Sequence, residues 1–167
     1  MIEARHNWFY GDNINTDYIF PGVYTYTLMT EDEMGRHAME GIDKEFTTNA
    51  APGDIIVCGK NWGCGSSREQ AVKCLKNRQI AAIISKGFSR IFYRNAINEG
   101  FPAIICPDAA EYIKPGMCVS IDLDNGKICC DDRVFIFPPY PDIIQSILNV
   151  GGLVPYVKAQ LMNRTRG

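Results

Sequence analysis

Residues 54–75 read DIIVCGKNWGCGSSREQAVKCL, and this stretch decides the fold. Its first part, residues 54–59, is a short apolar run bounded by turn residues, which is typical of a buried strand. From Ser67 onward the apolar residues recur at helical spacing, so the sequence predicts a helix over residues 67–77. Three glycines (Gly59, Gly63 and Gly65) and two serines therefore lie where a strand is followed by a helix.

The segments that follow this stretch repeat the alternation of strand and helix. An apolar run from Ile80 predicts a second strand, and residues 89–98 predict a second helix that ends at Gly100. Residues 103–106 predict a third strand. Strands and helices that alternate at this spacing favour a parallel βαβαβ core with right-handed crossovers.

The C-terminal third of the chain changes character. Two short strands flank the turn residues 124–126, which is typical of a hairpin, and residues 133–137 add a third β segment. A short helix is expected from Asp142 and a last ordered segment over residues 154–161, with residues 162–167 as a frayed tail. The fold class expected is α/β, with an antiparallel β layer added to the parallel core in a single domain over residues 1–167.

The N-terminal part contains one clear helix signal. Thr30 and Glu33 form a capping box, so a helix is expected to begin at Glu31 and to end near Gly41. It is preceded by the polar turn GDNINTDYIFPG, residues 11–22.

Composition excludes several classes of function. With 46% hydrophobic residues and a net charge of −2, the chain offers neither the basic surface that binds nucleic acid nor a cationic face for membranes. It carries no signal-type N-terminal segment and no apolar run long enough to span a bilayer. We therefore expect a cytoplasmic protein that binds a small molecule or another protein.

The cysteines predict no metal site. There are seven of them, none in a C-x-x-C pair, and only two histidines to supplement them. Several lie in apolar segments, where a reduced thiol behaves as a small core residue. This favours reduced structural cysteines, with a metal or redox role as the alternative.

The glycine-rich loop matches none of three familiar motifs. It lacks the lysine of a P-loop, the third glycine of a dinucleotide fingerprint and the final glycine of a nucleophile elbow. Ser66 and Glu69 fit a Ser-x-x-Glu capping box, which would be a purely structural role. Alternatively, Gly65 allows close approach of a ligand and Arg68 offers a two-pronged donor for a carboxylate. Ser66 would then be a base, its alkoxide stabilised by the helix start and Arg68, that removes the α proton of a carboxylic acid.

Three motifs together carry a family resemblance: GKNWGCGSSREQA (59–71), GDNINTDYI (11–19) and FSRIFYRNAINEG (88–100). Over residues 11–161 the chain closely resembles the small subunits of 3-isopropylmalate dehydratase, in the aconitase superfamily. The resemblance implies a swivelling β/β/α domain and a hydro-lyase that isomerises 2-isopropylmalate in leucine biosynthesis. It also implies a separate large subunit that carries a [4Fe–4S] cluster, in a heterodimer or heterotetramer, with no cofactor on this chain.

The same resemblance implies roles for individual residues. Ser66 matches the catalytic serine and Arg68 its companion that binds the substrate carboxylate, while Gly65 and Ser67 match ligand-contacting positions. Thr16 and Asp17 match a motif of the active-site cleft, although an Asx-rich turn would also explain them. At position 70 the family usually has histidine. Gln70 cannot titrate near neutral pH, so no proton-transfer role is assigned to it.

The loop Val23-Tyr24-Thr25-Tyr26-Thr27 matches the segment that distinguishes substrates within the family. It has no positive charge, so a tricarboxylate would leave a buried carboxylate without a partner. This favours isopropylmalate among branched 2-hydroxy dicarboxylic acids, with a 2,3-dimethylmalate or homoaconitate type of dehydratase as alternatives. A surface loop whose tyrosines pack on the following helix is the structural explanation.

Two further expectations concern the helix over residues 89–98 and the class of protein. Phe88, Ile91 and Phe92 are expected on its buried face, whereas Arg90 and Arg94 point to solvent or to a partner subunit. A non-catalytic anion-binding or assembly module is the competing class for the chain as a whole.

Overall fold

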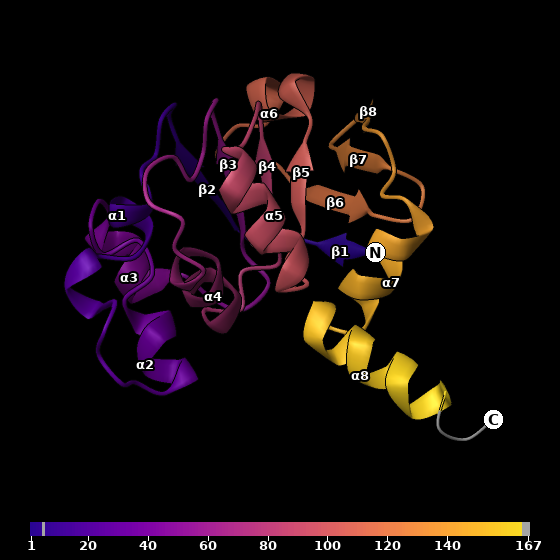
Figure 1. The fold of residues 1–167 in the computed structure, drawn as a ribbon. Helices are drawn as coiled ribbons and strands as arrows, with labels where there is room; N and C mark the ends of the chain where they lie inside the picture. The colour runs from indigo at the N-terminus through magenta and orange to yellow at the C-terminus, as the bar shows by residue number, and fades with distance from the viewer. Residues whose placement is uncertain (5, 165–167) are drawn as a thin grey trace.

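The computed structural model describes residues 1–4 and 6–164, which form two four-stranded sheets and a set of helices (Figure 1). One sheet is parallel, with the strand order β2 (Asn7–Tyr10), β3 (Ile55–Cys58), β4 (Ala82–Ser85), β5 (Ala103–Ile105). The other is antiparallel, with the strand order β1 (Ile2–Glu3), β6 (Val119–Asp122), β7 (Lys127–Cys130), β8 (Arg133–Ile136).

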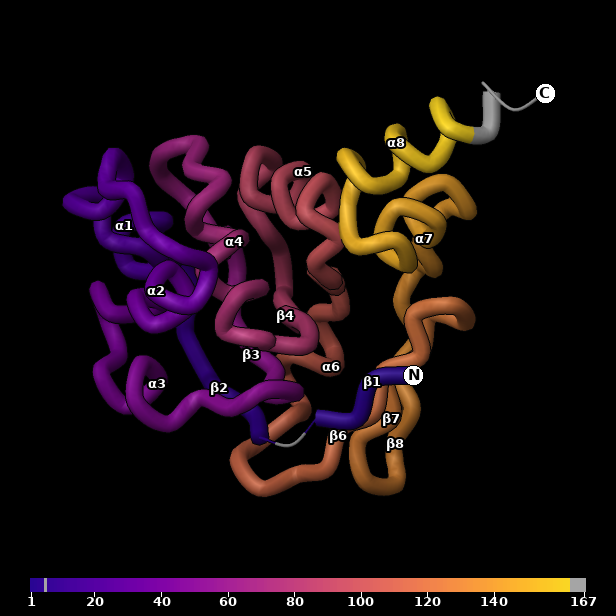
Figure 2. The backbone as a smooth tube through the Cα atoms, turned by 90° about the horizontal axis from the view of Figure 1, so that it is seen from below, coloured from indigo at the N-terminus to yellow at the C-terminus, as the bar shows by residue number. Residues whose placement is uncertain are grey.

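Most helices lie on one side of the parallel sheet (Figure 2). In chain order they are α1 (Thr16–Ile19), the 3₁₀ turn η1 (Gly22–Tyr24), α2 (Glu31–Arg36), α3 (Lys44–Asn49), α4 (Gln70–Asn77), α5 (Arg90–Asn98), α6 (Pro107–Tyr112), α7 (Asp142–Asn149) and α8 (Leu153–Arg164). Helices α7 and α8 lie beside α5, at the far end of the molecule from α1–α3 (Figures 1 and 2). Within the described residues, no helix has both the length and the apolar character needed to cross a membrane.

The parallel sheet is covered on both faces, which explains why its strands read as continuous apolar runs. In β3, Ile55 and Val57 pack toward the antiparallel sheet, in a cluster with Ile121 and Ile128. Ile56 and Cys58 alternate with them and pack toward the helices, in a cluster with residues of α1, α4 and α5. The layers are therefore antiparallel sheet, parallel sheet and helices, which confirms the expected β/β/α fold class.

The predicted core elements are confirmed with small changes at their ends. The three strands after residue 54 are parallel neighbours in one sheet, and the hairpin around Asp124 pairs β6 with β7 in antiparallel register. The Thr30–Glu33 capping box is present, with the Glu33 amide donating to Thr30 Oγ1 at 3.2 Å and Glu33 Oε2 accepting from the Thr30 amide at 2.7 Å.

Two predicted helix ends were wrong. Helix α2 ends at Arg36 rather than near Gly41, because the chain turns so that the Met39 amide donates to the Ile19 carbonyl at 2.7 Å. Met39 is fully buried there with a φ of 60°, outside the helical region. At the other terminus, α8 continues to Arg164, so residues 162–164 are helical rather than frayed. Residues 165–167 of the expected tail lie outside the described residues.

Candidate active site

The candidate site lies at the carboxyl ends of β2 and β3. The segment Gly11–Asp17 follows β2, and the glycine-rich loop Gly59–Arg68 follows β3. Since β2 and β3 are parallel neighbours, with Tyr10 opposite Cys58, both segments leave the sheet at the same edge. This is the edge at which parallel α/β sheets commonly bind ligands.

The two segments are held together mainly by backbone hydrogen bonds. An isolated bridge pairs Asn15 with Cys64 in parallel register. Three bonds join backbone groups: the Asn13 amide donates to the Lys60 carbonyl, the Gly63 amide to the Ile14 carbonyl and the Thr16 amide to the Cys64 carbonyl, each at 2.8 Å. In a fourth bond, the Lys60 amide donates to Asp12 Oδ1 at 2.6 Å. The path of the glycine-rich loop is therefore fixed by the backbone of the first motif.

Gly65 occupies a position that only glycine fits. Its φ is +107°, and a Cβ built there would lie 2.5 Å from Asn15 Oδ1. That oxygen is already engaged, because it caps α1 by accepting from the Asp17 amide at 2.9 Å. The absent side chain thus lets the loop lie directly against the start of α1.

Ser66 and Ser67 follow Gly65 and are exposed. Neither hydroxyl makes a hydrogen bond with any other described residue, although the Ser66 carbonyl accepts from the Arg68 amide at 2.8 Å. The Ser66 hydroxyl is therefore open to a ligand or to a second polypeptide. A buried Ser66 would have removed the mechanism that the sequence suggests.

The predicted capping box at Ser66 was wrong. Helix α4 begins at Gln70 rather than at Ser67, and Glu69 caps it without a side-chain hydrogen bond. The Glu69 carboxylate instead pairs with Lys73 Nζ at 2.5 Å. Because the field of a helix end falls off within about one turn, the start of α4 gives Ser66 little of the stabilisation that the sequence suggests. Gln70 is half-buried as the first residue of this helix.

Arg68 is fixed by a contact between the two motifs. Its Nη1 lies 2.6 Å from Asp17 Oδ1 and donates to the Phe20 carbonyl at 3.2 Å, with the side chain only 16% exposed. The hydrogen bond from Arg68, together with its positive charge and the Gly22 amide, holds the pKa of Asp17 below its usual range. Asp17 therefore stays charged and orients the guanidinium, whose other N–H groups have no partner within the described residues.

Gly22 lies against this ion pair. A Cβ at Gly22 would lie 2.9 Å from Asp17 Oδ1 and 3.3 Å from both Nη atoms of Arg68. Sequence reasoning singled out Asp17 and Arg68 separately but missed their contact and the role of Gly22. The signal that could have indicated the contact was one acidic and one basic side chain, Asp17 and Arg68, in two motifs that belong to the same site.

Thr16 is buried at the start of α1, and its predicted contact with substrate stays a prediction. It is 2% exposed, and its hydroxyl donates to Asn15 Oδ1 at 3.3 Å. Its amide donates a hydrogen bond to the Cys64 carbonyl, which helps to fix the position of the glycine-rich loop. Asp17, by contrast, is about half exposed, with 51% of its side chain accessible.

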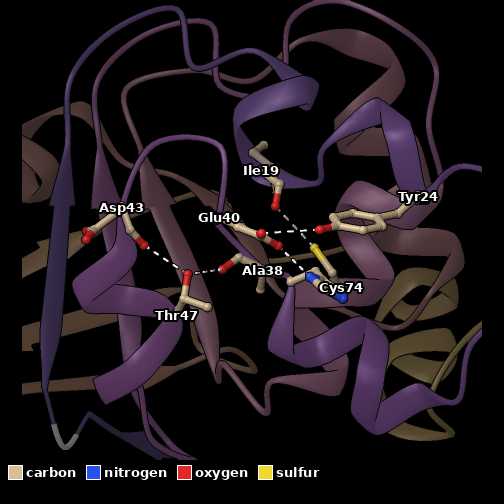
Figure 3. A network of polar contacts seen from close by, with 8 residues as sticks. Ile19, Tyr24, Ala38, Glu40, Asp43, Thr47 and Cys74 are labelled. Carbon is tan, nitrogen blue, oxygen red and sulfur yellow. Dashed lines mark hydrogen bonds and ion pairs between the residues drawn. The ribbon is translucent and has the colours of Figure 1, made fainter.

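The loop Val23–Thr27 turns one residue inward and others outward. Tyr24 packs on His37, with ring centroids 4.0 Å apart, and its hydroxyl donates to Glu40 Oε1 at 3.3 Å (Figure 3). His37 Nδ1 contacts the other oxygen of Glu40. Burial, and then the negative charge of Glu40, raise the pKa of Tyr24. Tyr24 therefore serves as the polar anchor of the loop.

Three side chains of the loop point outward, and two of them, Val23 and Tyr26, are apolar or aromatic. Val23 is 80% exposed and Tyr26 is 97% exposed, while Thr25 is half-buried and Thr27 exposed. Of the two tyrosines expected to pack on the following segment, only Tyr24 does so. Sequence reasoning missed Glu40 and His37, whose spacing carries no motif.

The cysteines lie mostly away from this site. All seven are free, and Cys58, Cys74, Cys106 and Cys130 are buried. Burial raises the pKa of Cys58 to about 12, so this thiol stays protonated. Within the part of the chain that the structure describes, no three His, Cys, Asp or Glu residues are grouped so that they could hold a metal ion.

Comparisons with known proteins place the chain in a family. Residues 12–108 match the model of the aconitase C-terminal domain. The 3-isopropylmalate dehydratase small subunit of Caldicellulosiruptor bescii is 45% identical over 91% of this chain and 92% of its own length. The small subunit 1 of Methanopyrus kandleri is 43% identical over 92% and 91%. A crystal structure of the 3-isopropylmalate dehydratase LeuD from Methanocaldococcus jannaschii covers 99% of both chains with a TM-score of 0.89 and 41% identity. The chain therefore belongs to the family of 3-isopropylmalate dehydratase small subunits, which is built on the aconitase C-terminal domain.

Proposed function

We propose that this chain is the small subunit of a cytoplasmic dehydratase that isomerises 2-isopropylmalate to 3-isopropylmalate in leucine biosynthesis. The names of its relatives supply the reaction. The observation that carries the proposal is the hydroxyl of Ser66, which is exposed and makes no hydrogen bond to the part of the chain that the structure describes. It lies on a loop fixed by the Asn13–Thr16 backbone, two residues before the oriented Arg68.

The reaction exchanges a hydrogen and a hydroxyl group between adjacent carbons. A base takes a proton from one carbon while the neighbouring carbon loses its hydroxyl group as hydroxide, and hydroxide and the proton then add to the double bond in the opposite sense. Ser66 Oγ is the base that takes the carbon-bound proton and later returns it. Because a serine hydroxyl is a very weak acid, its alkoxide must be stabilised by nearby positive charge. Arg68 is the cation closest to it in sequence, and the partner subunit would complete the set.

Arg68 and Ser67 bind the substrate carboxylate in this proposal. One nitrogen of the guanidinium is occupied by Asp17 and the Phe20 carbonyl, which fixes the plane of the group. The remaining N–H groups are suited to a two-pronged contact with a carboxylate. Gly65 would contact that carboxylate through its exposed backbone, since Asn15 fills the space where a side chain would lie.

The outward residues of the loop Val23–Thr27 select the substrate. Val23 and Tyr26 offer exposed apolar surface to the isopropyl group, and the loop has no cation to pair with a third carboxylate. A tricarboxylic acid would lose hydration without gaining a partner, which disfavours it.

A second polypeptide has to complete the site. Ser66, Ser67, Val23 and Tyr26 are all exposed, so another surface must enclose the substrate and exclude water. We assign this role to the large subunit that the term small subunit implies. When bound there, a [4Fe–4S] cluster would supply the Lewis acid for the departing hydroxyl group.

Reconstitution tests the proposal. The purified chain is mixed under anaerobic conditions with the large subunit encoded in the same organism, and conversion of 2-isopropylmalate is followed. Isopropylmalate, 2,3-dimethylmalate and homocitrate-type acids are compared in one assay, and we expect isopropylmalate to have the highest kcat/KM. Assembly without turnover of any of these acids would instead support the non-catalytic module.

A further inference from the structure

A cavity opens beside the glycine-rich loop. Its volume is about 530 Å³, and it lies between that loop and the first turns of α5. Asn61 and Gly65 line it from the loop, and Ser89, Arg90, Ile91 and Arg94 line it from the α5 side. Gly65 thus borders both this cavity and the candidate active site.

Two positive charges line the cavity without an internal partner. Arg90 and Arg94 are exposed, one helical turn apart on α5. Neither makes a hydrogen bond or ion pair with any described residue, in contrast to Arg36 and Arg68, which pair with aspartates. Like charges four residues apart on a helix repel each other and destabilise it slightly. An anion bound between Arg90 and Arg94 would offset this repulsion.

The wall of the cavity also exposes apolar surface. The sequence pattern places Ile91 on the buried face of α5, but its side chain is 48% exposed and faces the cavity instead. Phe88, half-buried at the cavity floor, is stacked on Phe92 with ring centroids 6.0 Å apart. A ligand that matches this lining therefore combines a carboxylate with apolar atoms. A carboxylate group alone would fill only a small part of the cavity volume.

We propose that this cavity is a docking pocket for an acidic side chain, flanked by an apolar one, of the large subunit. The inference rests on the proposed function, because it requires a second polypeptide over Ser66. That polypeptide must also pass over Gly65, where the cavity begins. The charge complementarity is specific, since two guanidinium groups can both donate to one carboxylate. Docking at α5 would then place the large subunit over the catalytic loop.

The test measures subunit affinity and catalysis separately. The double variant Arg90→Gln/Arg94→Gln is compared with the wild-type chain for binding to the large subunit, as Kd at two ionic strengths. We expect Kd to rise at least about tenfold and its salt dependence to flatten, because removing one partner of a buried interfacial charge pair leaves the other charge unpaired. Arg94→Lys keeps the charge but loses the planar guanidinium group, so its Kd should lie between that of the wild type and that of the double variant.

The matched control is Lys114→Gln/Lys127→Gln, which removes the same charge from two exposed lysines after α6 and on β7. Its Kd should equal that of the wild type, and no variant should have a substantially lowered thermal midpoint. At saturating large subunit, the arginine double variant should keep the wild-type KM. An unchanged Kd would overturn the inference, and an unchanged Kd with a raised KM would assign the cavity to a substrate carboxylate instead. Failure of the wild-type pair to convert isopropylmalate would count against the proposed function rather than against this pocket.

Discussion

The two loops that frame the candidate site are held in place by different means. The glycine-rich loop is fixed along its backbone, by hydrogen bonds to the Asn13–Thr16 segment and by the close approach of Gly65 to Asn15. Among the described residues, the loop Val23–Thr27 has one inward side-chain hydrogen bond, from Tyr24 to Glu40. The side chains of the glycine-rich loop are therefore free for catalysis, because the backbone maintains the loop conformation. In the loop Val23–Thr27 the outward residues can vary as long as the Tyr24–Glu40 hydrogen bond is kept.

The largest effect is expected at Ser66. Ser66→Ala should lower kcat of the reconstituted enzyme by about 10²–10⁴-fold, the usual contribution of a general base. Its hydroxyl makes no hydrogen bond with the described residues, so the thermal midpoint should not move. Ser120→Ala, which removes a partly exposed hydroxyl on β6, is the control and should leave kcat unchanged. A lowered midpoint with near-normal kcat would show that the serine is structural.

Arg68→Lys should give the next largest effect. The variant keeps the charge near Asp17 but loses the planar fork, so kcat/KM should fall by about 10–100-fold. Arg36→Lys, at an exposed pair with Asp32, is the matched control and should have no effect on catalysis. Equal activity of Arg68→Lys and the wild type would mean that only charge matters at this position.

Gly65→Ala tests the backbone of the glycine-rich loop. Alanine at a positive φ costs about 1–2 kcal/mol, and at Gly65 the contact with Asn15 Oδ1 adds to this cost. Gly116→Ala is the control, because its φ is +87° with nothing within 4 Å of the added Cβ. The free energy of unfolding, measured with urea, should fall further for Gly65→Ala. Equal losses would show that the Asn15 contact carries no weight.

A smaller effect is expected in the acid stability of the Asp17–Arg68 pair. The folded pKa of Asp17 is lowered, so its contribution to stability is present above the unfolded pKa and is lost as pH falls through the folded value. The stability difference between wild type and Asp17→Asn should therefore shrink below about pH 4. Unfolding by urea at several pH values measures it, and a difference that does not change with pH would contradict the assigned pairing.

The smallest effect is expected at Tyr24. Tyr24→Phe removes the hydrogen bond to Glu40 and keeps the ring on His37, so KM for isopropylmalate should rise only about twofold. Tyr156→Phe on α8 is the control. A large fall in kcat would mean that the tyrosine hydroxyl takes part in the chemistry.

Local patterns were sufficient to predict the core of the fold. The strands and helices from β3 to β5 carry strong periodicity and good caps, such as Ser89 at the start of α5. Strand β2 was missed because its sequence reads only as an aromatic run. Its strand geometry comes from pairing Asn7 with Ile55, a contact between residues far apart in sequence. The single turn of α1 likewise depends on Asn15 and on the contact of Thr16 with Cys64.

The candidate site was predicted as a set of residues but not as an arrangement. The motifs that carry the family resemblance named Ser66, Arg68 and Asp17, and the structure places each of them after a strand of the parallel sheet. The start of α4 was predicted too early in the chain. The Thr16 amide binds the Cys64 carbonyl and Lys73 pairs with the Glu69 carboxylate, and these two contacts outweigh the local capping signal. The inward turn of Tyr24 depends on Glu40, whose position no local pattern specifies.

The pairing of β1 with β6 has a consequence for synthesis of the chain. Ile2 pairs with Ile121, whereas the loops around Ser66 meet partners about 50 residues earlier in the sequence. On the ribosome, the parallel layer can assemble while the partner of the first strand has yet to be made. Until Ile121 emerges, the N-terminal strand has no partner, so the second sheet closes later than the parallel sheet.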